Sequence, residues 1–410
     1  MQRILVLGAG FAGLWSAVGA ARSLDELGIS PESIEVVVIN RTASHSIRVR
    51  NYEAALDETL VPLGDVLDPI GVKHVEGEVT DIDPNGRTVA CSIQGKPRVF
   101  PYDRLVFALG SRLVRPAIPG LGEHAFDVDT YEGATRLNSH IAALPSGQPS
   151  PGQRTVLVVG GGLTGIEAAT EMAGKLRAAW AGVGLDPAPP FRVILADRQP
   201  WIGSDMGESA RPVIVEALRA LCVETCLGVS VASVDEQGAT LTTGERIATA
   251  TVVWCAGMQA NPLTACFSTT HDRLGRLLVG ACLKIEGRMT EFAAGDVAWL
   301  PIDGIHPSVM SCQHARPMGR FAGHNAVCDL LGRPMLPLRI DWYTTILDLG
   351  PWGAVCTEGW DRHVVAQGAP AKRTKEIINR QRIYPPRSRK AQDILEAAAP
   401  AVQTPPTLFH

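Results

Sequence analysis

Two short glycine patterns in the sequence have the residue types and the spacing that bind a phosphate. Each has the form Gly-x-Gly-x-x-Gly. The six glycines are Gly8, Gly10 and Gly13 in the first copy, and Gly160, Gly162 and Gly165 in the second. The first glycine of such a pattern allows a tight turn, the second lets a pyrophosphate approach the backbone, and the third permits close packing of a helix on a strand. Amides at the start of that helix donate to the phosphates. The repeated spacing therefore predicts two dinucleotide sites.

After each pattern, a polar residue stands at the end of the next expected strand. A residue in this position normally binds the ribose of a dinucleotide. In the second copy this residue is Asp197, which suits a free 2′-hydroxyl and repels a 2′-phosphate. NADH is therefore expected in preference to NADPH, and the neighbouring Arg198 keeps NADPH open as the alternative. In the first copy the position holds Asn40, whose amide oxygen accepts a hydrogen bond without a charge. Arg41 beside it is expected to reach the adenine or a phosphate.

The segments around the glycines have the patterns of elements that would position them. Strands are expected at 4–7, 34–39, 155–159 and 191–196, and helices at 14–24 and 166–178. The order of strand, glycine turn, helix and strand is typical of dinucleotide-binding units. We therefore predict an α/β protein with two Rossmann-like doubly wound domains.

Length and composition limit the function classes. A chain of 410 residues is long enough for two or three domains. Its 38 basic and 42 acidic side chains give a net charge of -4, which does not favour nucleic acid as a partner. Nine cysteines without metal-ligand spacing predict a reducing compartment and no metal site. The tail lacks an apolar run of about 18 residues, so we expect a cytoplasmic protein without a transmembrane segment.

Three further segments match landmarks of a known family in the expected order. They are Tyr102–Gly110, Thr251–Gly257 and Glu291–Asp296. With the glycine patterns, they resemble the two-dinucleotide-binding-domain flavoproteins of the pyridine nucleotide-disulfide oxidoreductase superfamily, and most of all the type II NADH dehydrogenases. This resemblance implies that the first pattern holds FAD and the second holds NADH or, as the alternative, NADPH. It also implies hydride transfer from nicotinamide C4 to flavin N5, for which the rings must be held close together.

The resemblance also implies an interleaved domain order. A discontinuous FAD-binding domain is expected from residues 1–113 and 264–330, with a NAD(P)-binding domain, 114–263, inserted between them. Residues 331–410 are expected to form a small C-terminal α+β domain that closes the flavin site or forms a homodimer surface. A polar insertion, 181–190, is expected to be a surface loop near the cofactor.

Site residues follow from the matched motifs, residue by residue. Those implied for FAD are Gly8, Gly10, Phe11, Ala12, Gly13, Asn40, Arg41, Arg48, Ala108, Gly110, Gly295, Asp296, Gln313, His314 and Ala315. Those implied for NAD(P) are Gly160, Gly162, Leu163, Thr164, Gly165, Glu167, Asp197, Ala256 and Gly257.

Three of these residues are candidates for a catalytic role, each with a structural alternative. Glu167 stands where the family carries a glutamate near the nicotinamide, and the alternative is a carboxylate that only complements the helix dipole. Arg48 is expected to stabilise the negative charge of a reduced flavin, or else to pair with a nearby carboxylate such as Glu53. His314 is expected to supply a proton or hydrogen bond to the acceptor, or else to be a packed histidine.

The acceptor is the least determined feature. Residues 312–317 resemble the family's quinone motif Ala-Gln-x-Ala-x-Gln, with matches at Gln313 and Ala315 and departures at Cys312 and Pro317. A quinone-like or other small organic acceptor is the first hypothesis. The basic stretch 372–390 indicates a solvated helix or an oligomer contact, with a peripheral membrane contact as the alternative.

Two alternatives remain open. The first is a reductase of ferredoxin or another small redox protein, docked on a basic face. The arginines expected on this face are Arg48, Arg50, Arg316 and Arg320. The second, from a different class, is a redox-gated NADH-binding signalling flavoprotein.

Overall fold

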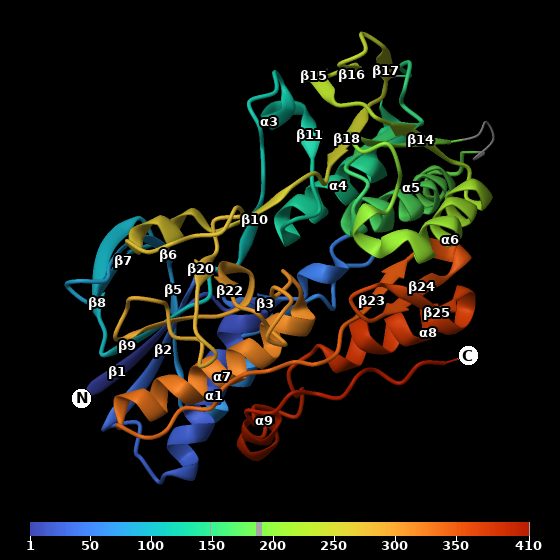
Figure 1. Cartoon of the computed structure of the whole chain (residues 1–410). Coiled ribbons are helices and arrows are strands. Elements are labelled where there is room, and N and C mark those ends of the chain that lie inside the picture. Colours follow the sequence, from blue (N-terminus) through green and yellow to red (C-terminus); the bar gives the residue numbers. More distant parts are fainter. Residues whose placement is uncertain (148, 186–190, 410) are drawn as a thin grey trace.

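The computed structural model describes residues 1–147, 149–185 and 191–409. Residues 186–190 of the expected loop 181–190 lie outside these ranges. Figure 1 shows two α/β units joined by extended segments, with the C-terminal part lying against both units.

The first unit is built on a five-stranded sheet in which all neighbours pair in parallel, in the order β21-β9-β1-β2-β5. Its strands are β1 (Gln2–Leu7), β2 (Ile34–Asn40), β5 (Lys73–Glu76), β9 (Arg104–Phe107) and β21 (Glu291–Ala293). The central strand β1 is buried from Ile4 onward, as expected for a parallel sheet covered on both faces. Helix α1 (Phe11–Glu26) follows β1, and α7 (Cys312–Leu330) packs beside α1.

The second unit repeats this plan. Its parallel sheet has the order β11-β18-β12-β13-β14. The strands are β11 (Ala125–Phe126), β12 (Thr155–Val159), β13 (Arg192–Asp197), β14 (Val223–Leu227) and β18 (Thr251–Trp254). The helices are α4 (Tyr131–Ala143), α5 (Leu163–Gly182) and α6 (Gly207–Ala220). The predicted fold class, with two doubly wound units, is confirmed.

Each unit carries a small antiparallel sheet of three strands. The strands are β6 (Glu78–Asp83), β7 (Thr88–Ile93) and β8 (Lys96–Pro101) in the first unit, and β15 (Val231–Asp235), β16 (Gly238–Leu241) and β17 (Arg246–Ala248) in the second. The two segments that cross between the units pair with each other as β10 (Ser111–Leu113) and β19 (Met258–Ala260). Shorter elements are β3 (Ser44–Ser46), β4 (Leu60–Pro62), α2 (Gly64–Leu67), α3 (Leu121–His124), β20 (Leu277–Leu278) and β22 (Ala298–Trp299).

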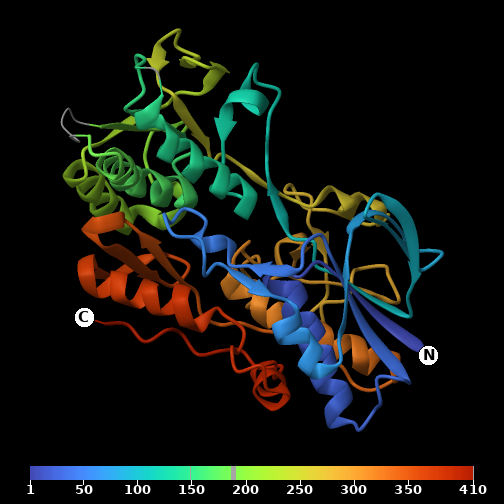
Figure 2. The same ribbon diagram turned by 180° about the vertical axis from the view of Figure 1, so that it is seen from behind.

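The C-terminal part is a mixed α and β structure. It contains the antiparallel strands β23 (Thr344–Asp348), β24 (Ala354–Glu358) and β25 (His363–Gln367), and the helices α8 (Gly368–Ile377) and α9 (Ala391–Ala397). Its sheet contacts α5 and α6 of the second unit, whereas α9 contacts α1 of the first. Figure 2, seen from behind, shows α9 beside the first unit and the segment after it returning along α8.

Both helices after the glycine patterns begin earlier than expected. We expected starts at residues 14 and 166, and the helices begin at Phe11 and Leu163. The third glycine of each pattern therefore lies inside the first helical turn. Glycine disfavours a helix by propensity, but the tight turn joins strand and helix directly at these two places.

Helices α1 and α7 cross with almost no space between their backbones. A Cβ atom added to Gly323 would lie 2.0 Å from the Ser16 carbonyl oxygen, and one added to Gly319 would lie 2.3 Å from the Ala12 oxygen. Real Cβ atoms do not approach oxygen so closely, so α7 needs glycine at both positions. This crossing fixes where α7 begins relative to the first glycine turn.

The crossing predicts different effects for two helical glycines. Gly323→Ala should lower the free energy of unfolding by about 3 kcal/mol, because the helices must separate to admit the methyl group. Gly174→Ala in α5, where an added Cβ meets nothing within 4 Å, should raise it by about 0.5 to 1 kcal/mol. Urea unfolding measures both, and equal effects at the two positions would contradict the close crossing.

Candidate functional site

A cleft of about 1450 Å³ lies between the two units. It is lined by the first glycine turn and the ends of β2 and β9 on one side, and by the second glycine turn and the ends of β13 and β18 on the other. Ligands of doubly wound sheets bind at the carboxyl ends of the strands. One cleft therefore meets both predicted dinucleotide sites.

Most of the residues expected at the site line this cleft. They are Gly10, Phe11, Ala12, Asn40, Arg41, Arg48, Ala108, Gly110, Gly295, Asp296 and Ala315 from the FAD set, and Gly160, Gly162, Leu163, Thr164, Asp197, Ala256 and Gly257 from the NAD(P) set. Within the described part of the chain, six others do not line it. These are Gly8, Gly13, Gly165, Glu167, Gln313 and His314.

The glycines that do not line the cleft serve packing. A Cβ on Gly13 would lie 1.9 Å from the Gly8 oxygen, and one on Gly165 would lie 1.7 Å from the Gly160 oxygen. A Cβ on Gly10, in contrast, would meet nothing within 4 Å. The backbone at Gly10 is therefore open to the cleft at the start of α1. This open backbone at a helix N-terminus fits the pyrophosphate of a dinucleotide.

The residues at the ends of β2 and β13 hold the two turns in the same way. The Asn40 amide oxygen accepts from the backbone N–H of Ala9 at 2.9 Å. The Asp197 carboxylate likewise accepts from the backbone N–H of Gly161, and also from that of Gln199 at 2.7 Å. Both side chains also line the cleft. Each side chain therefore binds the backbone of its turn and also lines the cleft where the ribose is predicted to bind.

Arg48 belongs to a charged cluster in the cleft. Its guanidinium pairs with Asp129, donates to the Ser111 hydroxyl at 3.0 Å, and lies 3.9 Å from the Asp296 carboxylate. Ser111 in turn donates to Asp296 at 2.6 Å. The expected alternative partner, Glu53, instead pairs with Arg50. Arg48 is thus held in place by groups from both units.

Glu167 is buried and contacts the C-terminal part. Its carboxylate forms an ion pair with Lys375 of α8 at 2.8 Å and accepts from the backbone N–H of Asp348 at 3.2 Å. Burial raises the pKa of Glu167, against the lowering effect of Lys375. Asp348 is itself bound by the Tyr52 hydroxyl at 3.0 Å and by Lys372. These contacts join α5, the first unit and the C-terminal sheet.

His314 and its neighbours are buried at the start of α7. The Nδ1 atom of His314 accepts from the backbone N–H of Val309 at 2.9 Å, and burial lowers the pKa of His314 to about 4. The imidazole is therefore neutral at pH 7, which does not favour it as a proton donor. Burial also raises the pKa of the Cys312 thiol, so this cysteine is not a ready nucleophile.

Several residues that line the cleft were not found by sequence reasoning. They include Asp129 and Ser111, which bind Arg48, and Tyr343 and Arg362, which come from the C-terminal part. Asp129 had a local indication, since it follows β11 at the carboxyl edge of a parallel sheet. No local pattern indicated Tyr343 or Arg362.

Comparison with known proteins agrees with this geometry. A family model described as pyridine nucleotide-disulphide oxidoreductase matches residues 2–319. The chain belongs to this family. It is therefore a FAD-dependent NAD(P)H oxidoreductase, and the predicted enzyme class and cofactors are confirmed at the level of the family.

Individual relatives cover nearly the whole chain. A NADH dehydrogenase-like protein of Mycobacterium tuberculosis is 56% identical over 407 residues, which is 99% of this chain and 100% of the relative. A type II NADH:quinone oxidoreductase of Staphylococcus saprophyticus is 25% identical, with 93% and 95% covered. The solved structure of NDH2 from Plasmodium falciparum in complex with NADH has a TM-score of 0.77 at 13% identity, with 97% of each chain covered. The sequence relatives support an NADH oxidoreductase, and the solved structure shows the same fold.

Two further features concern metal and membrane binding in the described ranges 1–147, 149–185 and 191–409. No group of three or more His, Cys, Asp or Glu side chains is arranged to hold a metal ion there. No helix there has the length and apolar character needed to cross a membrane.

The two turns predict how coenzyme choice depends on Asp197. Asp197→Asn keeps an oxygen for the Gly161 amide and removes the charge, as Asn40 does in the first turn. The ratio of kcat/KM for NADH over NADPH should fall about tenfold, because a 2′-phosphate is no longer repelled. Asp205→Asn removes the same charge from the same cleft and should leave the ratio unchanged. An equal fall in both variants would assign the preference to the overall charge of the cleft.

The Glu167 contacts predict a structural and a kinetic effect. Glu167→Gln should lower the free energy of unfolding by about 3 kcal/mol, because buried Lys375 keeps its bond to the Ile346 carbonyl but loses its paired carboxylate. Glu167→Gln/Lys375→Met should recover most of this loss. Flavin reduction by NADH, followed by stopped flow with FAD bound, should be slow in the single variant and recover in the double one. A rate that stays slow in the double variant would instead indicate direct action of Glu167 on the nicotinamide.

Proposed function

We propose that this enzyme takes hydride from NADH and passes the electrons to a quinone-like or other small organic acceptor. The observation that carries the proposal is the single cleft lined by both glycine turns. Bound FAD would supply a group that accepts a hydride from NADH and later releases electrons. The rest of the chemistry is positioning by the protein.

The described residues suit this division of tasks. Gly10 and Gly162, each the residue before its helix, would face the two pyrophosphates. Asn40 and Asp197 would hold the riboses. Arg48, fixed by Asp129 near Asp296, would present a positive charge that favours negative charge developing in the cleft.

A quinone-like acceptor is supported by the relatives and by one side chain. Relatives named type II NADH:quinone oxidoreductase and demethylphylloquinone reductase cover 93% and 86% of this chain. The Nε2 atom of Gln313 is buried and has no hydrogen-bond partner among the described residues. Gln313 does not line the cleft itself, but its neighbour Cys312 does, so an acceptor carbonyl that enters beside Cys312 would reach this amide and satisfy it. Cys312 and Pro317 still distinguish this chain from the motif of the family.

The runner-up, a reductase of ferredoxin, loses the feature that suggested it. The basic docking face expected from Arg48, Arg50, Arg316 and Arg320 is not present. Arg50, Arg316 and Arg320 are only 3%, 5% and 4% exposed, and Arg48 pairs with Asp129 inside the cleft. Buried guanidinium groups do not attract an acidic protein. The cytoplasmic location and the homodimer stay predictions from the sequence.

Half-reactions measured separately test the proposal. NADH should bleach the flavin within milliseconds in a stopped-flow mixing experiment, and a soluble quinone should restore the colour. Gln313→Leu should slow this reoxidation about tenfold, the effect of one lost hydrogen bond, and leave bleaching by NADH unchanged. Oxygen, ferredoxin and a panel of aromatic compounds serve as competing acceptors.

Gln259→Leu is the matched control, because Gln259 is exposed on β19 and does not line the cleft in the described structure. It should leave both half-reactions unchanged. Bleaching that takes minutes would contradict the enzymatic proposal and favour a redox-gated signalling protein. If quinones reoxidise the flavin no faster than oxygen does, the quinone-like acceptor is excluded. The proposed oxidation of NADH would not be affected by that result.

A further inference from the structure

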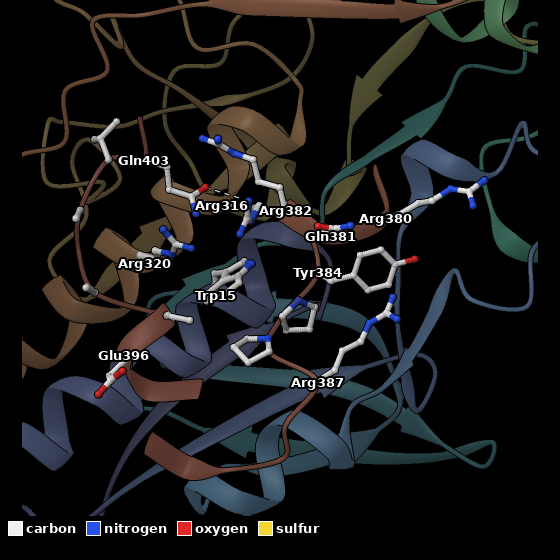
Figure 3. A pocket seen from close by; sticks show the side chains of 16 residues that line it. Trp15, Arg316, Arg320, Arg380, Gln381, Arg382, Tyr384, Arg387, Glu396 and Gln403 are labelled. Carbon is white, nitrogen blue, oxygen red and sulfur yellow. Dashed lines mark hydrogen bonds between the residues drawn. The ribbon is translucent and has the colours of Figure 1, made fainter. Parts of the chain in front are cut away.

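A second cavity, of about 610 Å³, lies where the last part of the chain covers α1 and α7. This last part, residues 380–409, is called the tail below. Figure 3 shows Trp15 of α1 at its centre, with Arg316 and Arg320 of α7 above the indole and Arg382 nearby on the tail. The residues that line it are distinct from those of the large cleft within the described ranges. It is therefore a separate site.

Arg316 and Arg320 are buried cations without a carboxylate partner in the part of the chain that the structure describes. Arg316 donates to the Gln403 side-chain oxygen at 3.0 Å. Arg320 has no hydrogen bond to any described residue and stacks over Trp15, with 4.4 Å from its central carbon to the ring centroid. Buried charges are normally paired, because leaving them unpaired in a protein interior is costly.

Three buried donors at the cavity have no acceptor among the described residues. The Nε atoms of Arg316 and Arg320 and the indole nitrogen of Trp15 are buried and unsatisfied among the described residues. Glu396 also lines the cavity, but it is exposed, accepts from Gln392 at 3.0 Å, and points away from the arginines in Figure 3. An oxyanion is the ligand that such a surplus of donors and positive charge would accept.

Burial and the repulsion between neighbouring positive charges lower the pKa values of both buried arginines. Burial, followed by the charges of Arg316 and Arg382, lowers the pKa of Arg320 to about 9. Burial, opposed by Cys312 and reinforced by Arg382, lowers the pKa of Arg316 to about 10. At these pKa values Arg316 and Arg320 remain protonated at neutral pH, and the guanidinium of Arg382 lines the same cavity.

We propose that this cavity binds the phosphate group of an organic ligand. A phosphate carries nearly two negative charges and three acceptor oxygens, and guanidinium groups bind it through paired hydrogen bonds. Trp15, Pro385, Pro386 and Val402 supply an apolar wall for the remainder of the ligand. Binding at this cavity does not depend on hydride transfer, so the phosphate site and the proposed function can be tested separately.

Calorimetry on the FAD-loaded protein tests the proposal with inorganic pyrophosphate as the probe. Saturating NAD⁺ keeps the probe out of the cleft, and ionic strength is held constant. Pyrophosphate should bind the unaltered protein, and Arg320→Met should weaken binding at least tenfold, because a guanidinium contact is lost. If Arg320→Met does not fold, Arg382→Met is expected to weaken binding in the same way. Arg389→Met is the matched control, because Arg389 lies on the same tail, pairs with Asp65 and does not line the cavity in the described structure.

A second arm distinguishes the source of the phosphate. Flotation with phosphatidylglycerol vesicles, compared with vesicles of phosphatidylcholine alone, asks whether the cavity takes a lipid headgroup. Binding to anionic vesicles that Arg320→Met abolishes and Arg389→Met retains assigns a lipid phosphate. Binding of pyrophosphate alone assigns a soluble one. Binding of neither probe, or equal binding by Arg320→Met and the unaltered protein, overturns the proposal.

Discussion

The backbone of each glycine turn lies so close to the helix that follows it that only a hydrogen atom fits between them. An added Cβ would lie within 2 Å of a carbonyl oxygen at Gly13 and at Gly165. This contact forces the helix to begin directly at the carboxyl end of its strand, with its first amides facing outward. Each parallel sheet places its turn at the carboxyl ends of its strands, and the packing of the two units brings both turns to one cleft. The rest of the site is arranged around these two fixed points.

Charged side chains then hold the separate parts of the chain in register. Arg48 of the first unit pairs with Asp129 of the second, and Glu167 pairs with Lys375 of the C-terminal part. Breaking a buried pair costs far more than forming it gains, so such pairs specify an arrangement more than they add stability. Glu167 has the contacts of a positioning residue, and its expected catalytic role stays a prediction. The pair with Asp129, together with the bond to Ser111, orients Arg48 in the cleft.

Helix α7 faces two sites at once. Ala315 lines the cleft, and Arg316 and Arg320, one turn apart on the same face, line the cavity under the tail. A period of 3.6 residues places residues four apart on one side of a helix and adjacent residues about 100° apart. The buried arginines differ from Arg48 because the described structure gives them no carboxylate. Their position next to the start of α7 brings this second cavity close to the site without merging the two.

The sequence alone determined the fold class, the family and the cofactors, because these depend on short patterns in which a strand, a glycine turn and a helix follow one another. It also identified Asn40 and Asp197, each of which ends the strand that follows a glycine pattern and its helix. Only the tertiary structure decided that Glu167 binds Lys375, that His314 is buried and neutral, and that Arg316 and Arg320 lie under the tail instead of on a docking face. Glu167 and Lys375, for example, are 208 residues apart in the sequence. No local pattern carries such a contact, because it depends on how whole sheets and helices pack.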